Sequence, residues 1–593
     1  MVTPFCDFHT HTQHSDGRLT PIELVKKAYA AGIRVLSITD HNYTEDLTEL
    51  REYAASAFNE EMIFVPGAEI SALYVDGTGE ELELHIVALN FRDDPNMTAL
   101  LAAHQPDRKP YIEAILKRLK DECSIDIGSY ESIRAQFPDK SYIGRMTLAR
   151  IMTDCGITAS VDDAFDRYLG SHGERRAYVK NPLRYFDLDT VVRTIIEAGG
   201  TPILAHLLYY DLDDGNRTGG EEKERLVRTF KELVTAYGGT GGMEVYYTRY
   251  KDMNERLYLL QMARKYGLLI SGGSDYHQQE TWETLDHHLS CSACQNLLDH
   301  LGIKVNYPLV PTPLHVLSGF SGVGKGTIAE KLKDRQIDGK PVALIQSYTS
   351  RSRRSENDPY TFVTREEFAA MVQSNKFLEF NSDFAQGGGY GTPVDAVRAA
   401  IESNKAVLLE IDRTGLMHLL TDGKICPDLV RSVFLAADAV DVATRLYLRG
   451  TETPSKIQRR LETGIQESHY LGLYDAVIVN DVVDDAVEAV IEAFEGKPCE
   501  STFDPVKFRA DMDEVLTTYW RTPDGLMYDP VEDTAEYYAA MVSIHKQLAA
   551  EFPANMLETH YCPEVWQRKQ MLLKAQGIHW RTPKEMNPQH SFE

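Results

Sequence analysis

The stretch LHVLSGFSGVGKGTIAEKL, residues 314–332, runs from an apolar strand pattern through a glycine-rich loop into a helix pattern. Backbone N–H groups of such a loop, at the N-terminus of a helix, wrap the phosphates of a nucleotide. Lys325 adds a positive charge between the β- and γ-phosphates, and Thr327 can reach Mg²⁺. The stretch therefore predicts an α/β domain that binds ATP with Mg²⁺. The loop residues assigned to ATP are Gly319, Ser321, Gly322, Val323, Gly324, Lys325, Gly326 and Thr327.

Short polar segments follow this loop and carry arginines, tyrosines and acids. They are SYTSRSRR, YTFVTREEF, FLEF, GGGYGTP, LLEID, RLYLRGTET, IQRRL and YDAVIVND, between residues 347 and 481. A nucleoside monophosphate needs arginines and phenolic hydroxyls around its phosphate, and guanine needs acceptors opposite its N–H donors. In this order the segments resemble the guanylate kinase family over residues 314–495. The alternative is a solvated basic run at residues 351–354 and simple packing of Tyr390 in a glycine-rich turn.

The guanylate kinase resemblance implies that this domain moves the γ-phosphoryl group of ATP to GMP. The residues that it assigns to catalysis are Lys325, Arg449 and Arg460. It assigns Arg445 to ATP, as part of the lid. The residues that it assigns to GMP are Ser347, Arg351, Arg354, Tyr360, Glu379, Tyr390, Thr392, Glu410 and Asp412. Glu379 and Asp412 would read guanine, and Glu410 would lie near Mg²⁺. The segment 380–391 is longer than the family spacing, which would loosen the guanine pocket or add a contact.

Upstream of the phosphate loop, histidines and acids recur where apolar strand patterns end. The segments are DFHTHTQHSDG, ITDHN, PGAEIS, ELHIVAL, ILAHL and GGSDYH, within residues 7–277. A barrel of parallel strands gathers the residues at its strand C-termini around one mouth, so we expect these side chains to converge. Imidazoles and carboxylates without cysteine indicate zinc, manganese or iron. Taken alone, His9 and His11 are a weak signal, because core or surface partners also satisfy such a pair.

The ordered segments resemble the PHP family, named for polymerase and histidinol phosphatase domains, over roughly residues 5–285. The resemblance implies a distorted (β/α)7 barrel and two or three divalent metals (Mn, Fe or Zn) that act in phosphate ester hydrolysis. By position, the first metal would be held by His9, His11, Glu69 and Asp275, the second by Glu69, His85 and His206, and the third by Asp16, His41 and His277.

Two further segments of this first domain carry candidates near the substrate. Arg145, in YIGRMTLARIM, resembles the phosphate-contacting arginine of the PHP family, and a surface ion pair is the alternative. Thr147 replaces the family's histidine there, and Leu207 follows His206 where proline is common, which puts the substrate in doubt more than the metals. Glu244, in GMEVYYTRY, either orients a metal ligand or is a plain carboxylate at the end of a strand.

The cysteines give a separate signal. Eight of them are scattered along the chain, which suits reduced thiols and a cytoplasmic location better than a disulfide framework. Cys291 and Cys294 form one CxxC beside His287 and His288, where zinc is conceivable. Because no second such pair follows at zinc-finger spacing, we favour unmetallated thiols.

The bulk composition sets the domain count and the class of partner. At 593 residues the chain is too long for one hydrophobic core, and we place domains at 1–306, 307–495 and 496–593, the last helix-rich and of unknown role. The net charge of −27 disfavours long nucleic acid and leaves small phosphorylated substrates, ATP and GMP as partners. We expect no membrane association, since no apolar run reaches the length of a membrane span. An oligomer stays open.

Three functions compete on these observations. The first is a bifunctional enzyme, a trinuclear-metal phosphoesterase for a small, nucleotide-related phosphate ester joined to an ATP-dependent guanylate kinase. The alternative joins a cyclic ribose phosphate hydrolase to a ribose bisphosphate kinase, but Glu379 and Asp412 argue against a substrate without a guanine edge. A third, a scaffold without activity, conflicts with the intact Lys325 and Thr327 of the phosphate loop.

Overall fold

The computed structural model describes residues 4–58, 62–103, 108–138, 143–170, 174, 176–179, 185–210, 212–213, 216–277, 289–305, 312–353, 359–382, 388–448, 454–517, 527–553, 556 and 562–589. The chain forms two compact units. The first comprises Met1–Pro311 with Leu420–Pro427, and the second comprises Thr312–Leu419 with Asp428–Glu593. The finer boundaries at residues 306 and 495 stay predictions.

The first unit is built on a sheet of seven strands in chain order. They are β1 (Phe5–Asp7), β2 (Ile33–Ile38), β3 (Ile63–Val75), β4 (Glu81–Leu89), β5 (Thr201–Leu204), β6 (Gly242–Tyr247) and β7 (Leu269–Gly273). Hydrogen bonds from Phe8 N to Gly272 O (3.3 Å) and from Asp275 N to His9 O (2.8 Å) close the sheet between its first and last strands. The α/β barrel fold is confirmed.

The expectation of parallel strands throughout was wrong for β4, which runs antiparallel to both β3 and β5. The physical reason is the short connection between β3 and β4, which turns back through a hydrogen bond from Asp76 N to Glu80 O (3.0 Å). A parallel crossover needs a dozen or more residues, so this turn dictates an antiparallel pair.

Helices flank the barrel strands. They are α1 (Pro21–Ala30), α2 (Leu47–Phe58), α3 (Pro95–Ala103), α8 (Leu188–Glu197), α9 (Glu221–Ala236), α10 (Met253–Tyr266) and α12 (Gln295–His300). A capping box marks the start of α1, since the Thr20 side chain accepts from Glu23 N and the Glu23 side chain accepts from Thr20 N. Pro21 fills the first helical position. Local chemistry alone therefore defines where this helix begins.

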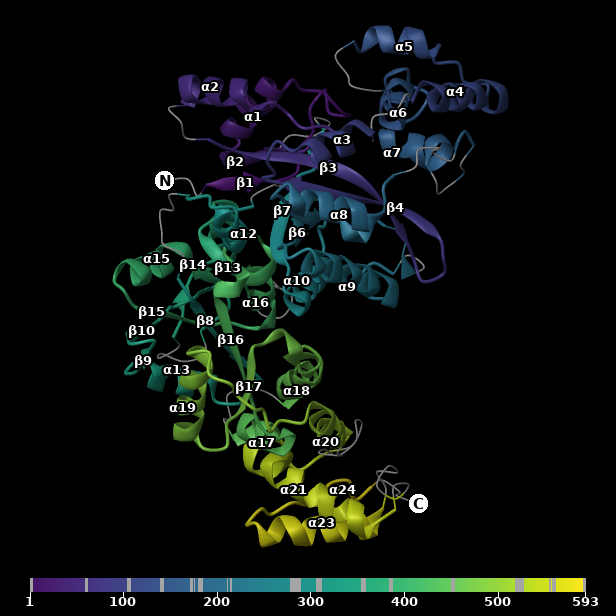
Figure 1. Ribbon diagram of the computed structural model, residues 1–593. Helices are drawn as coiled ribbons and strands as arrows, with labels where there is room; N and C mark the ends of the chain where they lie inside the picture. The colour runs from purple at the N-terminus through teal and green to yellow at the C-terminus, as the bar shows by residue number, and fades with distance from the viewer. Residues whose placement is uncertain are drawn as a thin grey trace. The chain divides into compact units, whose positions relative to one another are not determined.

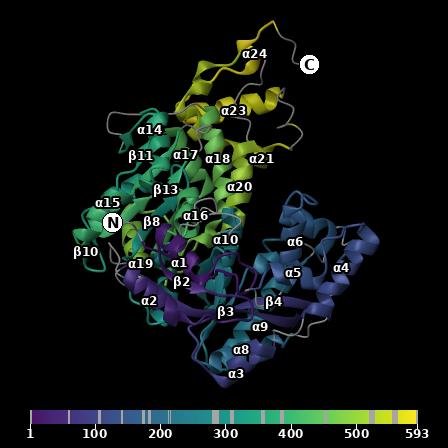
Figure 2. The ribbon, with the colours of Figure 1, turned by 90° about the horizontal axis from the view of Figure 1, so that it is seen from above.

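A helical insertion separates β4 from β5 and has a hydrophobic core of its own. It contains α4 (Lys109–Cys123), α5 (Tyr130–Gln136), α6 (Arg145–Asp154) and α7 (Val161–Ala164). Ile112, Ile133 and Leu148 are fully buried within it. Figures 1 and 2 both show α4, α5 and α6 grouped to one side of the barrel strands. Helix α6 carries Arg145 and Arg150, which bear on the site below.

The second unit contains two sheets. The larger has the order β17-β16-β8-β15-β10-β9, and the smaller has the order β12-β11-β14-β13. The strands of the larger sheet are β8 (Leu314–Gly319), β9 (Gln336–Ile337), β10 (Lys340–Leu344), β15 (Ala406–Glu410), β16 (Val430–Ala436) and β17 (Ala476–Val479). Those of the smaller are β11 (Tyr348–Thr349), β12 (Thr361–Phe362), β13 (Phe377–Asn381) and β14 (Tyr390–Pro393). The predicted P-loop α/β domain is confirmed, with β8 central and its pairs to β15 and β16 parallel.

The helices of this α/β domain include the one that follows the phosphate loop. They are α13 (Lys325–Leu332), α14 (Arg365–Gln373), α15 (Val394–Glu402), α16 (Arg413–Thr421), α17 (Ala439–Leu448), α18 (Pro454–Ser468) and α19 (Val483–Phe494). Across the described parts of both units, none of the helices combines the length and the apolar character that a bilayer crossing requires.

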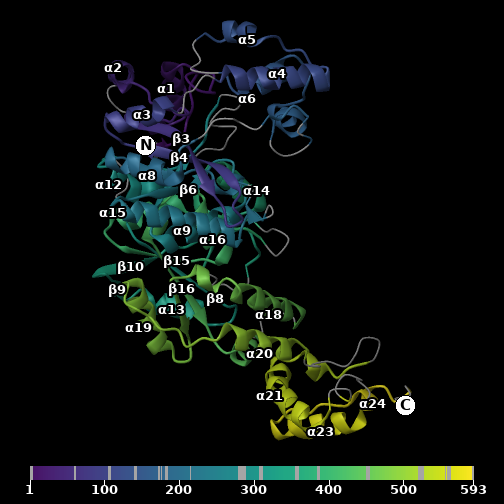
Figure 3. The ribbon, with the colours of Figure 1, turned by 45° about the vertical axis from the view of Figure 1, so that its right-hand side comes forward.

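The C-terminal extension is helical, as the sequence predicts. Its helices are α20 (Pro505–Thr517), α21 (Ala535–Glu551), α23 (Pro563–Ala575) and α24 (Pro583–Met586), and the last three lie together in Figure 3. Helix α20 packs against the α/β domain of the second unit, where the ring of Phe508 stacks on that of Phe320 with centroids 4.3 Å apart. Because Phe320 belongs to the phosphate loop, the extension supports that loop from behind.

Candidate active sites

The histidines and acids predicted in the barrel all come together. His9 and His11 directly follow β1, His41 follows β2, and Asp275 and His277 follow β7. The remaining candidates lie in the loop between β1 and α1 or on and after the middle strands, and they are Asp16, Glu69, His85 and His206. Isolated bridges between Thr10 and Tyr276 and between His41 and Glu69 extend the strand pairing into this region. Backbone pairing therefore holds these side chains at one end of the barrel.

Glu69 lies at the centre of the cluster and is 1% exposed. Its Oε1 lies 2.9 Å from His85 Nδ1 and 3.1 Å from His206 Nε2. Its Oε2 is approached by three more imidazole nitrogens, His9 Nε2 at 3.3 Å, His11 Nε2 at 3.3 Å and His41 Nδ1 at 3.1 Å. One carboxylate thus faces two groups of imidazoles through its two oxygens, which is the arrangement of a bridging ligand.

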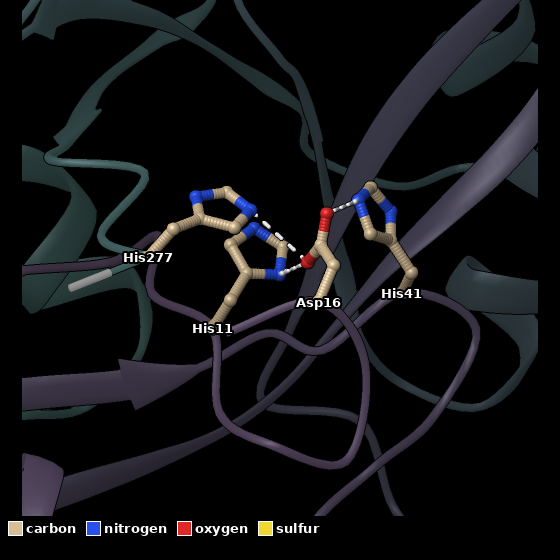
Figure 4. Close-up of side chains that lie close together, drawn as sticks. All are labelled: His11, Asp16, His41 and His277. Atoms are coloured by element: carbon tan, nitrogen blue, oxygen red, sulfur yellow. Dashed lines mark ion pairs between the residues drawn. The ribbon is translucent and has the colours of Figure 1, made fainter. Parts of the chain in front are cut away.

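Asp16 organises a second group, which Figure 4 shows. Its Oδ1 lies 3.0 Å from His277 Nε2 and 3.6 Å from His11 Nδ1, and its Oδ2 lies 3.6 Å from His41 Nε2. Asp275 completes a third group, with Oδ1 3.0 Å from His11 Nε2 and 3.6 Å from His9 Nε2. Each of the three groups offers several donor atoms close enough to share one cation.

The electrostatics of the cluster reflect this close packing of imidazoles and carboxylates. Burial alone would raise the pKa of Glu69, but His41, His85 and His9 hold it well below the usual value. Burial alone would lower the pKa of His85, but Glu69 and Glu83 raise it to about 10. Opposite charges therefore stabilise one another within this cluster.

Several buried donor atoms of the cluster lie close to opposite charges but make no hydrogen bond of regular geometry, which bears on whether metals fit. Among the described residues these atoms are His9 Nε2, His11 Nε2, Glu69 Oε2, His206 Nδ1 and His277 Nε2. Buried polar atoms are almost always paired, so a set of them at one place needs an explanation. Imidazole nitrogens with carboxylate oxygens are a donor set for divalent transition metals, and the residues present fit such ions.

Neighbouring acids fix the orientation of these candidate ligands. Glu244 accepts from His206 N (2.8 Å) and lies 2.7 Å from His9 Nδ1, so the interpretation in which it orients ligands fits the structure. Asp7 accepts from His9 N at 3.1 Å and from Ser274 N at 3.0 Å. Tight backbone packing also contributes, since a Cβ at Gly273 would lie 2.4 Å from the Cβ of His9.

Arg145 does not contact the cluster directly. Its Nη1 donates to Leu169 O at 3.2 Å, and its guanidinium lies 5.9 Å from the ring of Phe165. Its charge affects Glu83, which lies beside His85 at the edge of the cluster. Burial raises the pKa of Glu83, but His85 and Arg145 lower it to about 2. Arg150, which no sequence pattern indicated, lies on the same helix, and its guanidinium contacts the backbone of Asp16.

The cysteines of the barrel show no metal site within the described residues. Cys6, Cys291 and Cys294 are buried and form no disulfide among the described residues, and no closely spaced group of metal donors in the described chain includes a cysteine. His287 and His288, the other members of the zinc hypothesis, lie outside the described residues.

The phosphate loop of the second unit has the predicted strand, loop and helix. Gly322 and Gly324 have positive φ angles of 82° and 98°, which side chains with a Cβ rarely adopt. Lys325 Nζ donates to Gly319 O at 2.6 Å and to Phe320 O at 3.1 Å, so its ammonium lies folded over the loop. The remaining loop residues assigned to ATP, Ser321, Val323, Gly326 and Thr327, lie in the same turn between β8 and α13 or in the first turn of that helix.

Two predicted lid arginines contact this loop. Arg460 Nη1 donates to Ser321 Oγ at 3.3 Å, and Arg445 Nη1 donates to Val323 O at 3.4 Å. Arg449 and Arg354 lie outside the described residues. The lid and the loop are therefore already joined by charged side chains from α17 and α18.

The predicted GMP residues lie on the smaller sheet and on the loop after β15. Arg351 Nε donates to Tyr390 OH at 2.8 Å, and the ring of Tyr360 lies 5.5 Å from that of Tyr390. Thr392 Oγ1 donates to Glu379 Oε1 at 2.5 Å. Ser347 is buried just before β11, and Asp412 accepts from Asn381 Nδ2 at 3.0 Å, a partner that the sequence did not indicate. Part of the longer segment within 380–391 lies outside the described residues.

Glu467 is a second residue that the sequence analysis missed. Burial raises its pKa to about 7, with Lys325 acting in the opposite direction. Burial also raises the pKa of Glu410, and it lowers the pKa of Lys325 against the pull of Glu467 and Glu410. Glu467 and Arg460 are seven residues apart on α18, which places both on the helix face toward the phosphate loop. Only this helical spacing could have indicated Glu467.

The fold and sites define two classes of enzyme in one chain, a metal-dependent phosphoester hydrolase and a P-loop nucleoside monophosphate kinase. The PHP domain model matches residues 7–180, and the guanylate kinase model matches residues 312–497. The chain belongs to the PHP family through its first unit and to the guanylate kinase family through its second.

Known proteins resemble each part separately. The chain is 33% identical over 299 residues to a 5'-3' exoribonuclease of Haemophilus influenzae, a match that covers 49% of this chain and 95% of that protein. It is 39% identical over 184 residues to a guanylate kinase of Nocardia farcinica, a match that covers 30% of this chain and 92% of that protein. An amidohydrolase structure from Chromobacterium violaceum, with bound sulfate and no metal, is 28% identical over 46% of this chain and 89% of that chain, with a TM-score of 0.40.

Proposed function

We propose that the barrel hydrolyses phosphate esters at the 5′ end of short RNA or of a related nucleotide, and that the second unit phosphorylates GMP with ATP. The observation that carries the first part is the convergence of buried imidazoles and carboxylates around Glu69 and Asp16, several of whose atoms make no hydrogen bond of regular geometry among the described residues. The exoribonuclease similarity over nearly the whole of that relative supports a nucleotide-related substrate.

The residues of the barrel would hold up to three divalent metals in the groups already described. His9, His11 and Asp275 form one group, His85 and His206 face Glu69 in another, and the remaining group is that of Asp16, His41 and His277. When bound, such cations would supply positive charge to a phosphoryl oxygen and lower the pKa of an attacking water. Glu244 would keep the ring of His9 turned toward its group by accepting from Nδ1.

The net charge of −27 limits the substrate of the barrel rather than excluding RNA. It disfavours long, nonspecific contact with a polyanion. A site that binds only the end of a strand needs few phosphate contacts, and metals with a nearby arginine would provide them. We therefore propose short or single-stranded 5′ ends as substrates.

In the second unit, the predicted GMP residues contact one another, and the bound nucleotide would replace these contacts. Arg351, Tyr360 and Tyr390 would grip its phosphate, and Glu379 and Asp412 would accept from guanine N–H groups. Lys325 and Arg460 would neutralise the transferring phosphoryl group. GMP released by the barrel would be available locally to the kinase.

One experiment tests both activities. The full chain, loaded with Mn²⁺, is incubated with a 5′-phosphorylated RNA pentamer that begins with guanosine, with and without ATP and Mg²⁺. We expect GMP without ATP and GDP with it. A chain that releases no mononucleotide would refute the hydrolytic part. Lack of activity on added GMP, while ribose bisphosphates are phosphorylated, would refute the kinase part in favour of the sugar phosphate alternative.

A further inference from the structure

Arg150 combines deep burial with an incomplete set of hydrogen bonds. It lies on α6 of the helical insertion and is 5% exposed. Its Nη1 donates to the backbone oxygen of Asp16. Its Nε and Nη2 are buried and have no hydrogen-bond partner among the described residues. Leaving donors of a charged group unpaired in the interior costs more than leaving neutral ones unpaired, so this arrangement needs a partner that the described chain does not supply.

The two unpaired nitrogens form one edge of the guanidinium. Nε–H and Nη2–H point the same way and can bind two oxygens of one anion together. Carboxylates and phosphoryl groups match this fork, and such charge-assisted pairs are the strong ones. The unpaired edge therefore selects an anion with two adjacent oxygens.

The nearby charges of the protein do not fill this edge. Asp16 and Asp154 act favourably on the charge of Arg150, but among the described residues neither carboxylate is bonded to its Nε or Nη2. Asp154 instead lies 4.0 Å from Arg18. The guanidinium of Arg150 contacts the backbone of Asp16, whose carboxylate lies 3.0 Å from His277 Nε2. The anion that pairs with this edge therefore comes from outside the described chain and would bind at the edge of the candidate metal centre.

A purely structural role accounts for only part of the geometry. Holding the loop of Asp16 requires one donor, which Nη1 provides and a lysine ammonium could equally provide. Arg145, on the same helix, cannot present its guanidinium where the Nε and Nη2 edge of Arg150 lies. It precedes Arg150 by five residues, which turns it by roughly 140° around the helix axis, and it faces Leu169.

We propose that the Nε and Nη2 edge of Arg150 binds two non-bridging oxygens of a phosphoryl group of the barrel's substrate. This rests on the proposed hydrolytic function and adds a substrate-binding residue to it. The phosphoryl group is either the one that is cleaved or a 5′-terminal phosphate next to it, and both present the same oxygens. Arg150 would thereby tie the position of Asp16 to the position of the substrate.

The test compares Arg150→Lys with the parent chain, with Arg18→Lys as a matched control at an exposed arginine nearby. The lysine keeps the charge and one donor for Asp16 O but loses the planar fork. Three quantities are measured on Mn²⁺-loaded protein: bound metal, the affinity for inorganic phosphate by calorimetry, and kcat/KM on dinucleotides with a 5′-phosphate or a 5′-hydroxyl. We expect R150K to keep its metal and to lose roughly 10- to 100-fold in phosphate affinity and in kcat/KM, whereas R18K stays near the parent.

The outcomes separate the two phosphoryl groups and the rival explanation. A loss confined to the 5′-phosphorylated dinucleotide supports binding of the terminal phosphate, and an equal loss on both supports binding of the cleaved one. If R150K binds phosphate as the parent does, or loses its metal, the arginine only holds the loop of Asp16 and the proposal is overturned. Phosphate binding does not depend on an RNA substrate, so the role of Arg150 is tested even in a parent chain that cleaves no RNA.

Discussion

The candidate metal centre and the nucleotide site differ in how their polar groups are hydrogen-bonded. Around Glu69, several buried nitrogens and one carboxylate oxygen make no hydrogen bond of regular geometry among the described residues. In the kinase, the corresponding groups bind one another: Lys325 donates to loop carbonyls, and Arg351 donates to Tyr390. A cation needs several donors held open at fixed positions, whereas a nucleotide can replace internal hydrogen bonds one by one. The comparison predicts that bound metals determine the hydrolytic activity of the first unit. It also predicts that packing against the phosphate loop determines the stability of the second.

The largest effect is expected from removing the carboxylate that faces imidazoles through both of its oxygens, Glu69. Glu69→Gln keeps the size of the side chain but removes the charge that the surrounding imidazoles approach. We expect RNA or nucleotide hydrolysis to fall by roughly 10³-fold or more, because the groups on both oxygens lose their shared ligand. Metal content per chain and phosphate release are the measurements.

The kinase supplies the control for this prediction. GMP phosphorylation by the E69Q chain should stay close to that of the parent, and Lys325→Ala should show the reverse pattern. Equal loss of both activities in E69Q would mean that the chain has misfolded or that the two units do not work independently. Full hydrolysis in the presence of a chelator would break the comparison outright.

A smaller effect is expected where the C-terminal extension supports the phosphate loop. Phe508 is 3% exposed and stacks on Phe320, which is fully buried. Phe508→Ala should lower the free energy of unfolding of the second unit by about 3 kcal/mol, through lost contacts and a cavity. Val506→Ala, at a 66% exposed position on the same helix, should change it by less than about 0.5 kcal/mol.

Thermal unfolding monitored with and without ADP distinguishes the unit concerned, because ligand binding raises the melting temperature of the unit that holds the nucleotide. If F508A melts like V506A, the extension does not support the loop. A loss of kinase activity larger than the loss of stability explains would show that Phe508 also shapes the loop in the folded state.

The two folds could be predicted from the sequence because their decisive signals are local. The run from His9 to Asp16 and the loop from Gly319 to Thr327 place many functional groups within a few residues of a strand end, where the fold must bring them to one edge. The capping of α1 by Thr20 is local in the same sense. Such patterns can be recognised without knowledge of the tertiary structure.

The features that the sequence did not predict depend on helix rotation or on contacts distant in the chain. Arg145 attracted attention through its motif, yet the rotation of α6 brings Arg150 beside Asp16. Glu467 has no motif, and its burial near Lys325 follows from tertiary packing. The stack of Phe508 on Phe320 likewise joins residues far apart in the chain. The direction of β4 was misjudged because a barrel of parallel strands was expected and the short turn after β3 was not recognised in the sequence.

The smallest effect, a pH dependence, sharpens the comparison within the second unit. The pKa of Glu467 is raised by burial to about 7 in the folded chain, above its usual value of 4.5. Between these values the folded state binds the proton and the unfolded state does not, so the contribution of Glu467 to stability is fully present below pH 4.5 and falls as pH rises toward 7. Glu467→Gln should remove this slope between about pH 4.5 and 7. Glu462→Gln, at an exposed position on the same helix, should leave it unchanged. The measurement is the melting temperature of the ADP-sensitive transition across this range, and identical slopes in the two variants would show that the carboxyl of Glu467 is not held protonated beside the loop.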